Sequence, residues 1–173
     1  VRLAVRSRPM HGLDEAIDRL LRFLITDPPE GGRAVDDLLS AAAYAGETGR
    51  SAALCDLADA LGIRLGRAGR WSELAAVNDR AGLAARRLAD DRRLAAALIG
   101  LGRGRIGLRE FNAADADLTE ALSVAERVGD PSLAAQAHRA LARLAAQQHR
   151  WEVALHHDEC GLSLHRQCGD PLG

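Results

Sequence analysis

The segment that decides the fold is residues 130–169, DPSLAAQAHRALARLAAQQHRWEVALHHDECGLSLHRQCG. The preceding 40 residues, 90–129, read DDRRLAAALIGLGRGRIGLREFNAADADLTEALSVAERVG and align with it without a gap. Both begin with aspartate, and each carries an aromatic residue at the same position, Phe111 and Trp151. Trp71 stands a further 40 residues earlier. The chain is therefore built from a unit that recurs every 40 residues, a period typical of helical-repeat proteins.

Within a unit, apolar residues recur at helical spacing, and polar residues separate two such stretches. Leu133, Ala137 and Leu141 share one helical face. Asp130 can cap the helix that follows it, with Pro131 in the first turn. Each unit is therefore predicted to be a helix, a tight turn and a second helix. The predicted units are 11–50, 51–90, 91–130 and 131–170, and the predicted fold class is all-α, an α-solenoid of about four antiparallel helix pairs.

This pattern resembles the tetratricopeptide repeat (TPR) family in a longer, 40-residue spacing. The residues that carry the resemblance are Leu61-Gly62, Leu101-Gly102 and Leu141-Ala142 in first helices, the aromatics Trp71, Phe111 and Trp151 that open second helices, and the small residues Ala114, Ala121, Ala154 and Gly161. Small side chains at such positions let neighbouring helices approach closely. The resemblance implies a right-handed superhelix that forms one domain over residues 11–173, after an N-terminal extension of residues 1–10. Because the sequence does not begin with methionine, we expect a fragment of a longer chain.

Gly102, Gly104 and Gly107 spell G-x-G-x-x-G within GLGRGRIGLREF, residues 100–111, a pattern shared with dinucleotide-binding turns. In those proteins the glycines follow a strand and open a helix. Here the segment aligns with ALGIRLGRAGRW and ALARLAAQQHRW in the neighbouring units, which places it in the second half of a first helix. We interpret it as a glycine-rich repeat helix. Since each glycine costs a helix interior up to about 1 kcal/mol relative to alanine, we expect this helix to be weak.

Composition excludes several classes of function. A net charge of −1 leaves no overall positive field for nucleic acid, so no direct nucleic-acid binding is expected. All 23 basic residues are arginine, which excludes a P-loop lysine and a Schiff-base lysine. The three cysteines do not form a secreted disulfide framework, and no apolar run is long enough for a membrane span. We therefore expect a cytoplasmic protein without a membrane partner.

The densest group of metal-binding residue types is HHDECGLSLHRQC, residues 156–168. His157 stands three residues before Cys160, and His165 stands three residues before Cys168. Either pair can occupy one helical turn, but the two pairs lie about 12 Å apart along a single helix. No four-ligand metal site is therefore predicted from this stretch.

No arrangement typical of an enzyme occurs in the chain, so we predict no catalytic residue and no cofactor. Asp115 and Asp117 form a tight carboxylate pair, which we expect on a solvated helix face. His138 aligns with Leu98 of the preceding unit and is expected to be a core histidine.

In TPR arrays the first helices line a concave groove that binds peptides or helices, so the resemblance implies a binding groove here. Alignment assigns to it Asp59, Ile63 and Arg67 of the second unit, Ile99 and Arg103 of the third, and Gln136, Arg139, Arg143 and Gln147 of the fourth. Arg103, Arg139 and Arg143 can together hold a carboxylate or an acidic segment. In the alternative interpretation these arginines are solvated or pair with nearby Asp and Glu side chains.

The stretch from Val35 to Asp170 also resembles a narrower group, the C-terminal TPR arms of bacterial signal-transduction ATPase and SARP-type transcriptional regulators. The carrying residues are AAAYAGETGR (41–50), ALGIRLGRAGRWSEL (60–74), AARRLADDRRLAAAL (84–98) and ALSVAERVGDPSLAAQAHRALARL (121–144). This resemblance implies a non-catalytic interaction module, the sensing or docking arm of a regulator, with a protein or peptide partner. The alternative is a stand-alone TPR adaptor or scaffold unconnected to transcription.

Residues 169–173, GDPLG, repeat the start of the fourth unit, GDPSL. Solenoids normally end in a polar cap. The last predicted helix instead leaves Leu155, Leu162 and Leu164 partly uncovered. We therefore expect either further repeats or a homo-oligomer formed through the C-terminal repeat.

Overall fold

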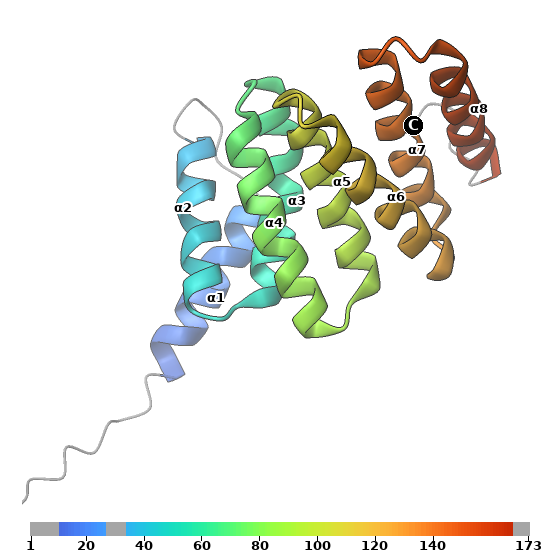
Figure 1. Ribbon diagram of the computed structural model, residues 1–173. Coiled ribbons are helices and arrows are strands. Elements are labelled where there is room, and N and C mark those ends of the chain that lie inside the picture. The colour runs from blue at the N-terminus through green and yellow to red at the C-terminus, as the bar shows by residue number, and fades with distance from the viewer. Residues whose placement is uncertain (1–10, 27–33, 168–173) are drawn as a thin grey trace, which may run out of the picture.

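The computed structural model describes residues 11–26 and 34–167, and every regular element in these two ranges is an α-helix. The helices are α1 (His11–Thr26), α2 (Ala34–Glu47), α3 (Ser51–Arg67), α4 (Trp71–Leu88), α5 (Asp91–Gly107), α6 (Phe111–Arg127), α7 (Pro131–Gln147) and α8 (Trp151–Gln167). Figure 1 shows them as successive antiparallel pairs that run from α1 at one end to α8 at the other. The predicted fold class, an all-α solenoid of helix pairs, is confirmed.

The 40-residue period of the sequence reappears in the helix boundaries. The first helices α3, α5 and α7 begin at residues 51, 91 and 131, and the second helices α4, α6 and α8 begin at 71, 111 and 151. As predicted, Asp130 caps α7, because its Oδ1 accepts the backbone N–H groups of Ser132 and Leu133 at 3.1 and 3.0 Å. Pro131 occupies the first turn of that helix. Asp90 caps α5 through the backbone N–H of Arg93.

One type of turn is used repeatedly between α2 and α8. In each of these turns one residue has a positive φ, and these residues recur every 20 positions: Gly49, Gly69, Ala89, Arg109, Gly129 and His149. The following residue then donates its N–H to the carbonyl five positions back, as in the 2.8 Å bond from Arg50 to Ala45. This is the Schellman arrangement that ends helices. Because all six turns share it, α3 to α8 are each 17 or 18 residues long and their side chains keep the same register.

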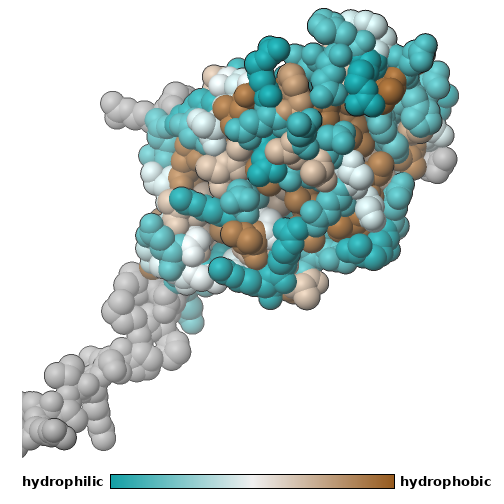
Figure 2. All heavy atoms as spheres, viewed as in Figure 1, coloured by the Kyte–Doolittle hydropathy of each residue, from teal (hydrophilic) through white to brown (hydrophobic). Residues whose placement is uncertain are grey.

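The first helices form the inner side of the array. Each first helix contacts the next one along the array, from α1 to α3, from α3 to α5 and from α5 to α7. Among the second helices of the described residues, comparable contact is found between α2 and α4. An array whose successive helices pack more closely on one side curves toward that side. We use the term inner surface for the solvent-facing side of α3, α5 and α7. On the face viewed in Figure 2, polar side chains cover most of the surface, with hydrophobic patches between them.

The glycines of α5 lie where this helix approaches α4 and α6. A Cβ atom on Gly104 would lie 2.7 Å from the backbone nitrogen of Ala75, and one on Gly102 would lie 2.6 Å from the side chain of Leu118. The G-x-G-x-x-G segment is thus the second half of a helix, as interpreted from the repeat, and in the described residues no strand precedes it. Its glycines let the helix backbones come together, which is a packing role.

Asp115 and Asp117 do not form the solvated carboxylate pair that the sequence predicted, because Asp117 is not exposed. Its side chain is buried, and Arg105 Nη1 donates a hydrogen bond of 2.5 Å to its Oδ2. Burial raises the pKa of Asp117, and the neighbouring Arg105 guanidinium opposes that rise. Asp115, two residues earlier, is exposed as expected. The pair was misassigned because the face of α6 that carries Asp117 is covered by α5, which the spacing within α6 does not reveal.

Substituting Gly104 tests the close packing of α5. We expect Gly104→Ala to lower the free energy of unfolding by about 1–3 kcal/mol, because the new Cβ meets backbone that cannot rotate away. Gly62→Ala is the matched control, since a Cβ at Gly62 of α3 meets no atom within 4 Å. We expect that change to stabilise the protein by up to about 1 kcal/mol. Urea denaturation followed by circular dichroism measures both, and equal effects would contradict the packing role.

Candidate functional site

The structure places eight of the nine predicted groove residues on the inner surface. Asp59, Ile63 and Arg67 of α3 are exposed, Arg103 of α5 is half-buried, Gln136 of α7 is half-buried, and Arg139, Arg143 and Gln147 of α7 are exposed. Ile99 differs, because it is only 4% exposed and belongs to the hydrophobic core. Its assignment to the groove is therefore corrected to a core position. It supports the inner surface from beneath and is not available to a ligand.

The arginine cluster (Arg103, Arg139 and Arg143) is the most distinctive feature of this surface. Partial burial lowers the pKa of Arg103 below its usual value, and the positive charges of Arg139 and Arg143 lower it further. The carboxylate of Asp59 acts in the opposite direction on the Arg103 pKa. The structure thus brings four predicted residues, from three successive first helices, within electrostatic reach of one another. No hydrogen bond or ion pair in the described chain joins Ile63, Arg67, Gln136 or Gln147 to this cluster.

Seven other arginines of the described residues pair with carboxylates, whereas others, such as Arg80, Arg87 and Arg109, form no ion pair within that part of the chain. Arg50 bonds Asp18 at 2.9 Å, Arg93 bonds Asp56 at 2.9 Å, Arg105 bonds Asp117, Arg127 bonds Asp91 at 2.9 Å, and Arg86 bonds Glu120 at 2.6 Å. Among residues 11–26 and 34–167, no carboxylate lies within 4.0 Å of a guanidinium nitrogen of the arginine cluster. Neighbouring guanidinium groups that form no ion pair repel one another and favour an anion that can lie between them.

Trp71 also belongs to this site, although we expected it only as the residue that opens a second helix. The guanidinium of Arg143 lies over the Trp71 ring, 5.5 Å from its centroid, in a cation–π contact. Gly107 leaves room for the ring, since a Cβ there would lie 2.3 Å from it. Gly66 lies beside the same ring and beside Arg103. Gly107 was the available sequence signal, because even a Cβ atom at that position would overlap the tryptophan ring.

The His/Cys stretch forms contacts that differ from the pairs considered in the sequence. His138 Nδ1 of α7 lies 3.0 Å from His157 Nδ1 of α8, and Cys160 Sγ lies 3.8 Å from His156 Nε2. His138 is therefore half-buried at a helix interface, not enclosed in the core as expected. In the described residues no group of three or more His, Cys, Asp and Glu side chains is arranged to hold a metal ion. Cys168 lies outside the described residues.

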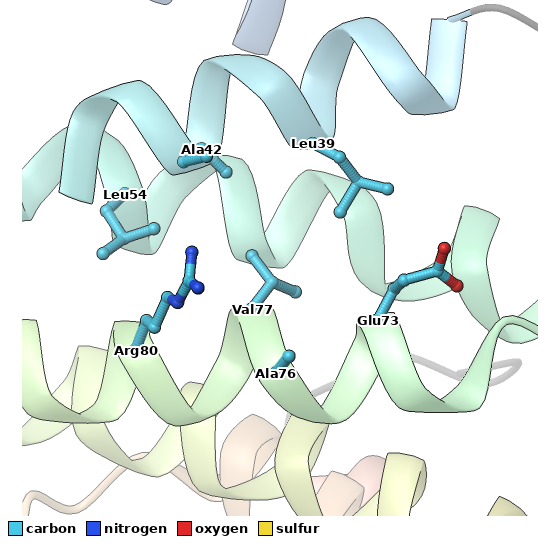
Figure 3. A pocket seen from close by; sticks show the side chains of 8 residues that line it. Leu39, Ala42, Leu54, Glu73, Ala76, Val77 and Arg80 are labelled. Atoms are coloured by element: carbon cyan, nitrogen blue, oxygen red, sulfur yellow. The ribbon is translucent and has the colours of Figure 1, made fainter. Parts of the chain in front are cut away.

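Two other features do not extend the site. A depression between α2 and α4 has a volume of about 110 Å³ and is lined by Leu39, Ala42, Val77 and Arg80, among others (Figure 3). It is smaller than the pockets of about 300–1,000 Å³ that hold small-molecule ligands. Cys55 is buried, and burial raises the pKa of its thiol to about 11, so it is not a reactive thiolate at neutral pH.

Comparisons with known proteins do not assign the chain to a family. No protein-family model matches it. A search of the curated proteins also finds no match. Separately, none of the described helices is both long enough and apolar enough to cross a membrane. The site must therefore be interpreted from its own geometry.

The unpaired charge of Arg103 gives a prediction about stability. We expect Arg103→Ile, which introduces the residue found 40 positions earlier at Ile63, to raise the free energy of unfolding by about 0.5–1 kcal/mol. The reason is that it removes a half-buried charge that Arg139 and Arg143 repel. Arg80→Ile on α4 is the control and should change stability by less than about 0.5 kcal/mol. If Arg103→Ile destabilised the protein in urea denaturation, Arg103 would be a structural residue.

Proposed function

We propose that this chain is a non-catalytic protein-interaction module that binds an acidic segment of a protein partner on its inner surface. The observation that carries the proposal is the arginine cluster: Arg103 is half-buried beside the positive charges of Arg139 and Arg143, and none of the three forms an ion pair within the described residues. A half-buried guanidinium that remains unpaired costs free energy in the unbound protein. Such a cost is typical of sites that are retained for binding, since a ligand can remove it.

Guanidinium geometry favours carboxylates as the ligand groups. Each arginine presents a planar fork of N–H donors that can bind a carboxylate through two parallel hydrogen bonds. The cluster extends over α5 and α7, so it suits several acidic side chains in succession better than one small anion. The Trp71 ring, stacked by Arg143, adds an aromatic surface at the same place. Asp59 at the edge of the cluster would repel an acidic chain and so restrict its path across α3.

We further propose that the array is of the TPR type and serves as the sensing or docking arm of a bacterial transcriptional or signalling regulator in the cytoplasm. The support is the resemblance of the repeat residues together with the solenoid of helix pairs. The alternative is a stand-alone adaptor or scaffold unconnected to transcription. A Walker A motif upstream of Val1 in the native gene would favour the regulator, because such regulators place an ATPase before the TPR arm.

Binding of a labelled acidic peptide tests the proposed surface. The probe is a fluorescein-labelled peptide of about twelve residues, rich in Glu with interspersed Leu, titrated with the protein and followed by fluorescence anisotropy. We expect binding that weakens as salt is added, because screening reduces attraction between exposed charges. The triple variant Arg103→Glu/Arg139→Glu/Arg143→Glu should lose about 100-fold or more in affinity.

The matched control is Arg80→Glu/Arg87→Glu/Arg166→Glu, which makes the same change in net charge with exposed arginines of second helices. This control should weaken binding by less than about tenfold, through long-range electrostatics alone. Equal losses in both triple variants would show non-specific charge attraction. No binding by the native protein to acidic peptides of any tested sequence would contradict the proposed ligand class.

An apolar surface on α8 supports a second proposal, association through the C-terminal repeat. Trp151, Leu155 and Leu162 are 63%, 61% and 55% exposed, whereas Leu164 is half-buried and packs against the core. We expect light scattering to detect a homo-oligomer at micromolar concentration that Leu155→Glu/Leu162→Glu converts to a monomer, because charges at an apolar interface are costly. A native protein that is monomeric at all concentrations would rule this association out.

A further inference from the structure

The last helix pair is joined by a direct hydrogen bond between two imidazole rings. His138 Nδ1 on α7 and His157 Nδ1 on α8 lie 3.0 Å apart, and their ring centroids are 5.2 Å apart. One nitrogen must donate its proton and the other must accept it, so at least one ring must keep an unprotonated nitrogen. If both rings carried two protons, two N–H groups and two positive charges would face each other at this distance.

Charges on α6, on α8 and in the turn before α8 act on the two rings. From α6, Glu126 favours protonation of His138, and Asp115 favours protonation of His157. From α8, His156 opposes protonation of both rings, and Arg150, in the turn before α8, opposes protonation of His157. From α5, Arg103 is coupled electrostatically to Arg139 and Arg143 of α7 and does not contribute to either imidazole shift.

Burial decides the balance among these charges. It is the largest cause of the shift at both rings, and it lowers the pKa of His138 and of His157 below the ordinary histidine value of 6.5. The carboxylates of α6 only partly offset it. The folded protein therefore resists protonation of this pair, while the unfolded chain does not.

We propose that the His138–His157 hydrogen bond makes the packing of α8 on α7 sensitive to pH, so that acidification to about pH 5 loosens the last helix pair. This inference goes beyond the proposed binding function and concerns its regulation. His138 directly precedes Arg139 on α7, so the helix that the bond holds also carries two members of the arginine cluster. Once α8 loosens at acidic pH, α7 is held only by its contacts with α5 and α6. Arg139 and Arg143 of α7 would then shift relative to Arg103.

The sign of the pH effect follows from proton linkage. Because the folded-state pKa values are depressed, the unfolded chain binds more protons over the range just below pH 6.5. Stability is therefore full above the ordinary histidine pKa and falls as the pH decreases toward the depressed folded-state values. Acid-sensitive carboxylates elsewhere also respond to pH, so the test must isolate this pair.

A double-mutant cycle isolates the pair. His138→Leu introduces the residue that occupies the equivalent position 98, and His157→Ala removes the partner on α8. We expect the two substitutions to be coupled by about three- to tenfold in the unfolding equilibrium constant at about pH 7.5, the size of one hydrogen bond. At about pH 5 we expect the coupling to vanish or to reverse in sign. His165→Ala, elsewhere on α8, should leave the pH dependence of the native protein unchanged.

Coupling that is equal at the two pH values would overturn the proposal, and so would no coupling at about pH 7.5. If a variant fails to fold, NMR titration of the histidine rings in the native protein decides instead. Two imidazoles that share a proton titrate in coupled steps, whereas independent titration of both rings at the ordinary value would refute the bond. Neither experiment involves a ligand, so its result is independent of the proposed binding of an acidic segment.

Discussion

The close approach of α5 to its neighbours is the constraint on which the rest of the structure depends. Gly104 brings the α5 backbone against Ala75 of α4, and Gly102 admits the side chain of Leu118 from α6. Any side chain at these positions would push α5 away from the helices on both sides. Because α5 is the middle first helix of the inner surface, its position sets where α3 and α7 lie relative to each other. The distance between charges on α5 and α7 is thus a consequence of missing Cβ atoms.

The same constraint builds the site around Trp71. Gly107 leaves space for the indole ring at the end of α5, and the ring in turn supports Arg143 from α7. The six equivalent turns add regularity, since they keep positions 63, 103 and 143 at the same register in successive first helices. Isoleucine occupies the first of these positions, and arginine occupies the other two. At these equivalent positions the positive charge therefore lies on α5 and α7, and α7 also carries His138 of the His138–His157 bond.

The fold and the helix pairs could be predicted from the sequence because both follow from the 40-residue period and from the helical spacing of apolar residues within one unit. Asp130 as a cap and the glycine motif within a helix followed from the same local arguments. Contacts between helices could be predicted less well from the sequence. The spacing that placed Ile99 on a groove-lining face does not tell how far a neighbouring helix covers that face, and here the side chain is buried. Asp117 was misassigned for the same reason.

Two contacts between side chains of different helices were not predicted, although the grouping of Arg103 with Arg139 and Arg143 was. His157 was compared with Cys160 on its own helix, but the structure pairs it with His138 on α7. Trp71 was treated as part of the repeat pattern, and its contact with Arg143 spans 72 positions in the sequence. A single sequence without distances cannot rank such pairs, whereas the burial and charge of the folded chain can.

The central claim is that the inner surface of α5 and α7 is a binding surface for acidic segments. The most direct measurement is hydrogen–deuterium exchange of the chain with and without the Glu-rich peptide, because exchange reports which backbone segments become protected. We expect slower exchange in α5, in α7 and at the start of α4 around Trp71, with little change in α6. Protection confined to second helices, or none while the peptide is bound, would contradict the claim.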